Sequence, residues 1–428
     1  MHATGSIDCM RSVSRPRSSD AVNHAVLVGG VRFAHRKFLK LGHRVTFAER
    51  PDEFRPGDET LGSRLLLVDC HHPTLLRDML LAIHSHDPIA GIVSYTEFEQ
   101  EAVWYSSEAL ALPRTSLRAI QCTRDKGRMR EELERAQLSP IAYRLGSDFG
   151  DIEQFANSNG FPLILKPRSD MGSRGILSIR DASEMLLARA WAADRTAFLV
   201  EELLAGAEIS AETFTINGHH VHLTLTDKIT TGPPHFVELG HTVPSGVSPT
   251  VAATVWSLVD NFLTLVDHHF GPAHTELRLT DRGPRIIESH VRPGGDCIVD
   301  LMEFAFGYDV YMLYAGALIG ETTLRPADFA PTERGHGAAA IRYLTPPPGR
   351  IVSLDGFTDL ERQPGWVRTY DPYVVGGTVS PILNSGSRGG WVMAIGSTHA
   401  EVMNRAERLR ALPHVTVDKS GISNETAL

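Results

Sequence analysis

A lysine and a glycine-containing loop stand together near the middle of the chain. Lys166 ends an apolar strand-like run, and residues 167–175 read P-R-S-D-M-G-S-R-G. Gly172 and Gly175 let this loop bend closely over an anion and turn backbone N–H groups toward it. From these residues alone, the lysine is either a phosphate ligand or a solvated strand end. The spacing differs from G-x-x-x-x-G-K-[ST], which excludes a P-loop nucleotide triphosphatase.

Three glutamates flank a short polar link between two further strands. One strand runs into Glu201 and Glu202, and Glu208 opens the next strand. A planar adenine fits against such an apolar segment while backbone groups of the link meet its amino group and ring nitrogen. A carboxylate at position 208 can accept hydrogen bonds from ribose hydroxyls. The alternative is a solvated hairpin with three surface glutamates.

Two more carboxylates face each other across a predicted hairpin. The turn 281–284 (D-R-G-P) joins two alternating strands, and the alternation brings Glu276 and Glu288 within reach of each other. Adjacent carboxylates repel unless a cation separates them. The pair therefore indicates a hard metal ion, Mg²⁺ or Mn²⁺, with phosphate oxygens completing the octahedron.

Composition narrows the classes of partner. The chain has 428 residues, 42% of them hydrophobic and 22% charged, and a formal net charge of −9. These values are typical of a globular protein and argue against nucleic acid or an anionic membrane surface as a partner. The apolar stretch 310–320 is shorter than the ~20 residues of a membrane helix. Four cysteines without a C-x-x-C pair favour the cytoplasm.

Strands and helices alternate over residues 21–116, after a Ser- and Arg-rich segment, 1–20, that we expect to be a disordered tail. The alternation predicts a Rossmann-like domain with a parallel sheet. Its first turn, 29–33, departs from G-x-G-x-x-G, and the only acidic residue at the end of its second strand, Glu49, is expected to be solvated. A structural α/β domain is therefore favoured over a dinucleotide site. The expected strands are 24–28, 43–48, 65–68 and 89–94, and the expected helices are 32–41 and 97–110.

The remainder is predicted as α+β structure in two parts. Residues 117–330 form the larger part, divided into 117–197 and 198–330, and residues 331–428 form a small mixed C-terminal domain. Expected helices are 125–136, 151–159, 182–193 and 398–411. Expected strands are 162–166, 176–179, 197–201, 208–216, 221–227, 338–344, 366–370 and 391–395.

The phosphate loop, the glutamate link and the carboxylate hairpin, in this order, resemble the ATP-grasp superfamily. The stretches 226–228 (T-D-K) and 236–245 (F-V-E-L-G-H-T-V-P-S), with R-x-x-G-D at 292–296, are most similar to its L-amino acid ligase (dipeptide synthetase) branch. The resemblance implies a pre-ATP-grasp N-terminal domain, an ATP-grasp fold of two α+β subdomains and a small C-terminal domain.

The resemblance also implies a nucleotide site. Lys126 and Lys166 would hold the α- and β-phosphates, Glu201, Glu202 and Leu204 would flank adenine, and Glu208 would bind ribose. The loop over the γ-phosphate would comprise Ser169, Gly172, Ser173, Arg174 and Gly175.

Metal and substrate roles follow from the same resemblance. Glu276 and Glu288 would carry the metals, and His290 stands where the family usually has asparagine, so that it either ligates a metal or faces the substrate. Arg292 would brace the phosphoryl group or the acyl phosphate. The remaining substrate-side residues are Glu238, His241, Gly294, Gly295 and Asp296.

The implied reaction is ATP-dependent activation of a carboxylate as an acyl phosphate, followed by attack of an amine. The expected partners are ATP, Mg²⁺ or Mn²⁺, and two small molecules, for which amino acids are the expected class; a homodimer is a further option. Two alternatives stay open. One is an ATP-grasp enzyme with another acceptor, such as a γ-glutamyl or carrier-thiol ligase or a carboxylase. The other is a non-catalytic nucleotide-binding protein.

Overall fold

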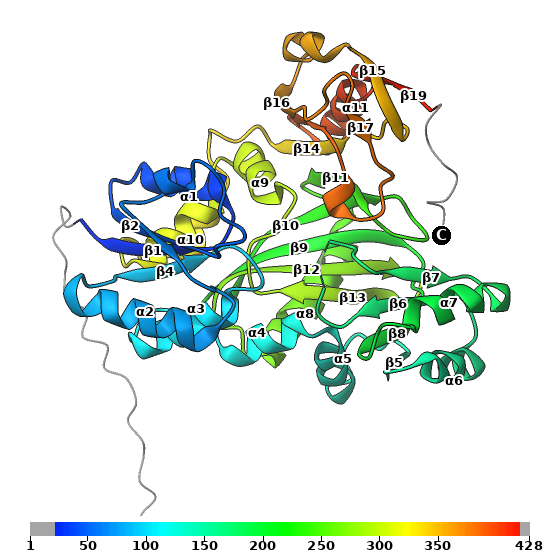
Figure 1. Ribbon diagram of the computed structural model, residues 1–428, viewed down its shortest axis with the longest axis horizontal. Coiled ribbons are helices and arrows are strands. Elements are labelled where there is room, and N and C mark those ends of the chain that lie inside the picture. The colour runs from blue at the N-terminus through cyan, green and yellow to red at the C-terminus, as the bar shows by residue number, and fades with distance from the viewer. Residues whose placement is uncertain (1–21, 171, 420–428) are drawn as a thin grey trace, which may run out of the picture.

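The computed structural model describes residues 22–170 and 172–419, whose arrangement is drawn in Figure 1. The segment predicted as a tail, 1–20, lies outside the described residues. In the described part of the chain the strands form four sheets, one parallel and three antiparallel. The predicted sequence of α/β structure followed by α+β structure is thereby confirmed. No helix in the described ranges is long and apolar enough to cross a bilayer.

The parallel sheet near the N-terminus has the strand order β3-β2-β1-β4. Its strands are β1 (His24–Val28), β2 (Arg44–Glu49), β3 (Arg64–Leu67) and β4 (Gly91–Ser94). Its helices are α1 (Arg32–Leu39), α2 (Pro73–His86) and α3 (Gln100–Ala109), with a 3₁₀ turn η1 (Asp58–Thr60). The helices expected from the sequence do not include α2. Its first residue is Pro73, and proline suits this position because no backbone N–H is needed there.

Two antiparallel sheets enclose the middle of the molecule. The smaller has the order β5-β8-β6-β7, and the larger has the order β13-β12-β9-β10-β11-β14-β18-β16. The strands up to residue 290 are β5 (Tyr143–Gly146), β6 (Leu163–Pro167), β7 (Leu177–Ile179), β8 (Phe198–Glu202), β9 (Ala207–Ile216), β10 (His219–Thr230), β11 (Glu238–Val243), β12 (Phe270–Thr280) and β13 (Gly283–His290). The helices are α4 (Leu117–Arg124), α5 (Lys126–Arg135), α6 (Phe149–Asn159), α7 (Met185–Ala192), α8 (Pro249–Leu265), α9 (Ile298–Phe306) and α10 (Val310–Leu318), with η2 (Ala182–Glu184).

The large sheet does not stop at residue 330, where we expect a separate domain to begin. Strand β11 pairs with β14 (Ala338–Tyr343), which continues the sheet through β18 (Trp391–Gly396) to β16 (Trp366–Tyr370). The other C-terminal elements are β15 (Gly349–Asp355), β17 (Thr378–Val379), β19 (His414–Asp418) and α11 (His399–Arg410), with η3 (Pro326–Phe329), η4 (Phe357–Arg362) and η5 (Ser385–Ser387). The C-terminal region is thus joined to the central sheet by backbone hydrogen bonds.

One hydrophobic core joins the N-terminal sheet to the central region. Helix α10 packs beside α1 and β4, as Figure 1 shows, and Leu318 lies so close to Gly91 that a Cβ there would meet its carbonyl oxygen at 2.5 Å. The Tyr95 hydroxyl donates to the carbonyl of Tyr311 at 3.0 Å. The apolar stretch 310–320 is therefore an interior helix.

The expectation of a solvated Glu49 is wrong, because this carboxylate is fully buried. Arg32, the first residue of α1, donates to Glu49 Oε2 at 2.8 Å and also to both carboxylate oxygens of Asp58. Its guanidinium further donates to the carbonyl of Gly30, so it fills the space beside the turn after β1. A buried cation there provides the partner that the sequence pattern around Glu49 does not reveal.

We expect Arg32→Met to lower the urea midpoint of unfolding substantially, because Glu49 and Asp58 would stay buried without their counter-ion. Removing one member of a buried ion pair costs about 3–5 kcal/mol. Arg36→Met, on the exposed face of the same helix, is the matched control and should change stability by no more than about 0.5 kcal/mol. Equal midpoints for the two variants, measured by circular dichroism, would show that Glu49 and Asp58 do not depend on Arg32 for their burial.

Candidate active site

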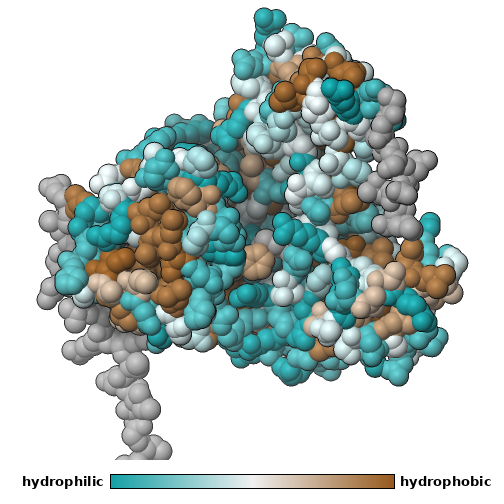
Figure 2. All heavy atoms as spheres, in the orientation of Figure 1, coloured by the Kyte–Doolittle hydropathy of each residue, from teal (hydrophilic) through white to brown (hydrophobic). Residues whose placement is uncertain are grey.

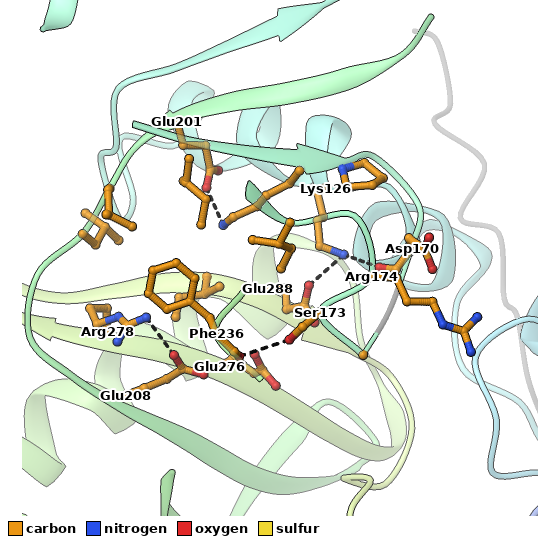
Figure 3. A pocket seen from close by; sticks show the side chains of 18 of the residues that line it. Lys126, Asp170, Ser173, Arg174, Glu201, Glu208, Phe236, Glu276, Arg278 and Glu288 are labelled. Atoms are coloured by element: carbon orange, nitrogen blue, oxygen red, sulfur yellow. Dashed lines mark hydrogen bonds and ion pairs between the residues drawn. The ribbon is translucent and has the colours of Figure 1, made fainter. Parts of the chain in front are cut away.

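Residues from the four-stranded and the eight-stranded antiparallel sheets line a cavity beside the 167–175 loop (Figure 3). The predicted nucleotide residues that line it are Lys126, Lys166, Gly172, Ser173, Arg174, Glu201, Glu202, Leu204 and Glu208. Ser169 and Gly175 belong to the same loop but do not line this cavity; both are exposed. The structure therefore brings together most of the side chains that the three separate sequence segments indicate.

Lys166 is not a solvated strand end, since it is only 6% exposed. Its Nζ donates to Glu201 Oε2 at 2.6 Å from the neighbouring strand β8. Arg130 of α5 donates to the other oxygen of Glu201. Burial alone would raise the pKa of Glu201, but Arg130 and Lys166 lower that pKa to about 2. Glu201 is therefore an ionised anchor that holds Lys166 in place.

Glu276 and Glu288 lie within reach of each other on β12 and β13, as the hairpin pattern predicts, and a bulge between Glu276 and Leu277 brings them directly opposite each other. Each carboxylate is neutralised by a lysine, and the two lysines come from different elements. Lys126 Nζ lies 2.7 Å from Glu288 Oε2, and Lys228 of β10 donates to Glu276 Oε1. Burial would raise both carboxyl pKa values, but the adjacent lysines hold the pKa of each below its usual range. Both groups are ionised and directed into the cavity (Figure 3).

Lys228 is the central cation of a group of three carboxylates, Glu208, Glu238 and Glu276. Its side chain is 1% exposed, and its Nζ lies 3.1 Å from Glu208 and 3.6 Å from Glu238, besides Glu276. Burial alone would lower its pKa, but these three carboxylates raise that pKa well above the usual value. Sequence reasoning includes Lys228 in a family-like stretch without giving it a role. Arg278 completes the group by an ion pair to Glu208 at 2.7 Å.

Two histidines hold the outer sides of the carboxylate pair. His290 Nε2 is 3.0 Å from Glu288 Oε1, and His274 Nε2 is 3.2 Å from Glu276 Oε1. Their rings stack with centroids 6.2 Å apart. Burial alone would lower the pKa of His274, but Glu212, 2.8 Å from its Nδ1, and Glu276 raise that pKa to about 9. The mirrored H-x-E and E-x-H patterns at 274–276 and 288–290 could have revealed this pairing.

Glu97, in the segment between β4 and α3, reaches into the site and has no sequence motif to mark it. Its Oε2 is 2.9 Å from His290 Nδ1 and accepts from Arg292 Nε at 3.0 Å. Burial would raise the pKa of Glu97, but His290 and Arg292 lower that pKa to about 2. The N-terminal region thus fixes the position of two predicted site residues.

A second cavity adjoins the first and contains most of the predicted substrate-side residues. Glu238, His241, His290, Arg292, Gly295 and Asp296 line it, together with Glu276 and Glu288. Gly294 does not line it; a Cβ at this position would meet Glu212 and His274 at 2.9 and 3.1 Å. The two cavities share Gly172, Arg174, Glu238, Glu276 and Glu288, so the carboxylate pair stands between them.

The C-terminal region contributes residues that local sequence patterns do not indicate. Arg388 donates to both carboxylate oxygens of Asp296, and His241 Nε2 lies 3.3 Å from one of them. Burial would raise the pKa of Asp296, but Arg388 and His241 lower it. Ser385 Oγ donates to Glu238 Oε2 at 2.8 Å. These contacts place the segment 384–388 directly against the second cavity.

The 167–175 loop is held at two points over the cavity. The backbone N–H of Ser385 donates to the carbonyl of Gly172 at 3.0 Å, and Ser173 Oγ donates to the carbonyl of Phe236 at 3.1 Å. Gly172 has φ +66°, a conformation that favours glycine. The loop is therefore closed onto both the central sheet and the C-terminal segment.

The donor set fits a hard divalent cation that phosphate oxygens help to bind. Within the described ranges no group of three or more His, Cys, Asp or Glu side chains is arranged to hold a metal ion by itself. Mg²⁺ usually takes only one or two carboxylates and completes its octahedron with water and substrate phosphates. Glu276 and Glu288, ionised and facing the cavity, supply those carboxylates.

Two families match the chain. Residues 159–300 match the ATP-grasp domain, and residues 342–418 match the family described as L-amino acid ligase C-terminal domain 2. The ATP-grasp match covers the 167–175 loop, the glutamates at 201, 202 and 208, and the hairpin that carries Glu276 and Glu288.

Three curated relatives are between 24% and 26% identical to the chain. An uncharacterized protein of Sinorhizobium fredii is 26% identical over 72% of this chain and 64% of its own length. Carnosine synthase 1 of Homo sapiens is 25% identical over 44% of this chain and 24% of its own length. Phosphoribosylamine–glycine ligase of Streptococcus suis is 24% identical over 37% and 42%, respectively. The chain spans less than two thirds of each relative.

Solved structures share the whole fold. An L-amino acid ligase from Bacillus licheniformis has a TM-score of 0.79 at 20% identity and covers 93% of this chain and 99% of its own. A phosphoribosylglycinamide synthetase from Anaerococcus prevotii has a TM-score of 0.71 at 16% identity, over 92% of this chain and 100% of its own. With the family matches, these similarities confirm the resemblance seen in the sequence. The chain thus contains an ATP-grasp domain at residues 159–300 and a C-terminal domain of the L-amino acid ligase type at residues 342–418.

Proposed function

We propose that this protein is an ATP-dependent carboxylate–amine ligase that activates the carboxylate of an amino acid as an acyl phosphate and joins it to an amine. The observation that carries the proposal is the carboxylate pair Glu276 and Glu288, which stands between a cavity lined by two buried lysines and a second cavity lined by Arg292. A phosphoryl group held at this boundary faces both a nucleotide and a second substrate.

In this proposal the first cavity binds ATP. Lys126 and Lys166 pair with the α- and β-phosphates, and the closed 167–175 loop covers the γ-phosphate with backbone N–H groups. Adenine lies between the Glu202–Leu204 link and Phe236, and Glu208 accepts from the ribose hydroxyls. Mg²⁺ or Mn²⁺, when held by Glu276 and Glu288, supplies positive charge to the transferring phosphoryl group.

The second cavity binds the carboxylate substrate. Arg292, oriented by Glu97, faces the position where negative charge collects during phosphoryl transfer. Glu238, His241, Gly295 and Asp296 surround the remainder of the substrate. No side-chain nucleophile is required, because the substrate carboxylate itself is the nucleophile.

The bonds formed and broken balance in two steps. A substrate carboxylate oxygen forms a bond to the γ-phosphorus while the bond to the β-phosphate oxygen breaks, and ADP leaves. The amine nitrogen then bonds to the acyl carbon, the carbon–oxygen bond to phosphate breaks, and the proton lost by nitrogen leaves with phosphate or solvent. The closed loop excludes water, which would otherwise hydrolyse the acyl phosphate.

Hydroxylamine should trap the acyl phosphate. With ATP, Mg²⁺ and a panel of amino acids but no other amine, at least one amino acid should give a hydroxamate in step with ADP release, because hydroxylamine replaces the amine substrate. ADP release without hydroxamate or dipeptide for every amino acid would reject acyl-phosphate formation. Absence of both would favour a nucleotide-binding protein without ligase activity.

Glu288→Gln should reduce the rate of hydroxamate formation on the order of 10³-fold, about 4 kcal/mol, because the neutral carboxamide binds a divalent cation much more weakly than the carboxylate does. Glu134→Gln, an exposed carboxylate on α5, is the matched control and should keep the wild-type rate. An unchanged rate for Glu288→Gln, with the same Mg²⁺ dependence as the wild type, would show that the hairpin carboxylates take no part in the reaction.

A further inference from the structure

A groove beside the turn of the carboxylate hairpin shares none of its described lining residues with the two cavities of the candidate active site. It lies where this turn, residues 138–139 after α5 and one face of α8 meet, and its volume is about 610 Å³. Small-molecule sites usually have volumes of ~300–1,000 Å³. We call this hollow the hairpin groove. No binding or catalytic role inferred from the sequence falls on its lining residues.

Positive charge is concentrated at the hairpin end of the groove. Arg282 and Arg285 line it, and among the described residues of the lining there is no acidic side chain. Burial and the neighbouring Arg282 together lower the pKa of Arg285. Two neighbouring cations that repel each other favour an anion that contacts both, because the anion relieves the repulsion.

The two arginines are held by contacts that leave donors for a ligand. Arg285 donates from Nε to the carbonyl of Pro140 at 3.1 Å and from Nη1 to the carbonyl of Pro284 at 3.0 Å. Within the described ranges Arg285 pairs with no carboxylate, and its Nη2 makes no hydrogen bond. Arg282 is half-exposed and donates from Nη2 to Glu202 Oε2 at 2.5 Å. Arg285 is therefore an oriented cation that has capacity for an anion.

Helix α8 adds polar groups to the groove. This helix packs on β9, β10 and β13, and Val255 and Val259 on its apolar face are fully buried. Ser257 and Asn261 lie one turn apart on its other face, line the groove and are exposed. Neither side chain makes a hydrogen bond to another described residue. The molecular surface over α4 and α5 is mostly hydrophilic in Figure 2, whereas apolar residues gather on the N-terminal part.

We propose that the hairpin groove binds the phosphate group of a small molecule, at a site separate from the nucleotide and independent of the proposed ligase function. Arg282 and Arg285 pair with the phosphate oxygens, as guanidinium groups do in charge-assisted hydrogen bonds. Ser257 and Asn261 donate hydrogen bonds to the same ligand, and Leu258 offers an apolar contact. Free phosphate and phosphate esters share this chemistry.

The position of the groove connects it to the first cavity. Arg282 belongs to the groove, and its partner Glu202 lines the first cavity at the start of the Glu202–Leu204 link. The other carboxylate oxygen of Glu202 accepts from the backbone N–H of Ala142 at 2.9 Å. A phosphate in the groove therefore contacts the same guanidinium that braces this link.

Calorimetric titration with inorganic phosphate tests the proposal, with the nucleotide site first filled by a non-hydrolysable ATP analogue and Mg²⁺. The wild type should bind one phosphate per chain in this state. Arg285→Gln should weaken that binding about tenfold or more, because the neutral side chain loses a charge-assisted hydrogen bond.

A second variant is needed because Arg285 also holds two backbone carbonyls. Asn261→Glu leaves those contacts intact and should weaken phosphate binding about tenfold by repulsion. Thr250→Glu is the matched control, because Thr250 is exposed on the same helix but does not line the groove; it should bind phosphate like the wild type.

A parallel titration with glycerol 3-phosphate distinguishes the sources of the phosphate group. Tighter binding of the ester would identify a phosphate ester as the ligand, and tighter binding of inorganic phosphate would identify free phosphate. Absence of binding of both to the wild type, wild-type affinity in Arg285→Gln or Asn261→Glu, or equal effects of glutamate at positions 250 and 261 would each overturn the groove assignment. Failure of the ATP analogue to bind would instead count against the ligase function, and the comparison of the four proteins would still test the groove.

Discussion

Two ionised carboxylates that face each other across neighbouring strands impose the main constraint on this structure. Glu276 and Glu288 repel, and their side chains are only 13% and 15% exposed, so that little solvent screens them. Lys126 from a helix pairs with Glu288, and Lys228 from a strand pairs with Glu276. The elements that carry these lysines meet at the hairpin, and the two cavities open on either side of it. Each carboxylate of the pair therefore has a lysine partner, and Lys228 is shared with Glu208 and Glu238.

Distant parts of the chain complete this centre. Glu97 belongs to the N-terminal region and orients His290 and Arg292. Arg388 belongs to the C-terminal region and neutralises Asp296. The core that joins α10 to the N-terminal sheet and the strand pairing of β11 with β14 hold these regions against the central sheet. Each flanking region therefore supplies a buried charge partner to the central site.

Local patterns were sufficient where a short segment determines its own geometry. The turn at 281–284 fixes the register as far as the pair Leu277–Ile286, so the proximity of Glu276 and Glu288 was predictable, but their direct opposition depends on a bulge between Glu276 and Leu277. Burial of Glu49 was not, because it depends on Arg32 and Asp58, which approach only in the folded chain. Arg388 lies in a segment without periodicity, and its partner Asp296 is far away in sequence. The sequence therefore predicts the hairpin and the 167–175 loop but does not reveal their long-range ionic partners.

One contact that closes the 167–175 loop joins the backbone N–H of Ser385 to the backbone carbonyl of Gly172. Because neither atom belongs to a side chain, substitutions in the C-terminal segment can alter the surface beside the loop without removing this latch. Closure of the loop at this point thus depends on the backbone of the segment and not on the identity of its side chains. Sequence change at these positions therefore does not by itself open the cavity to solvent.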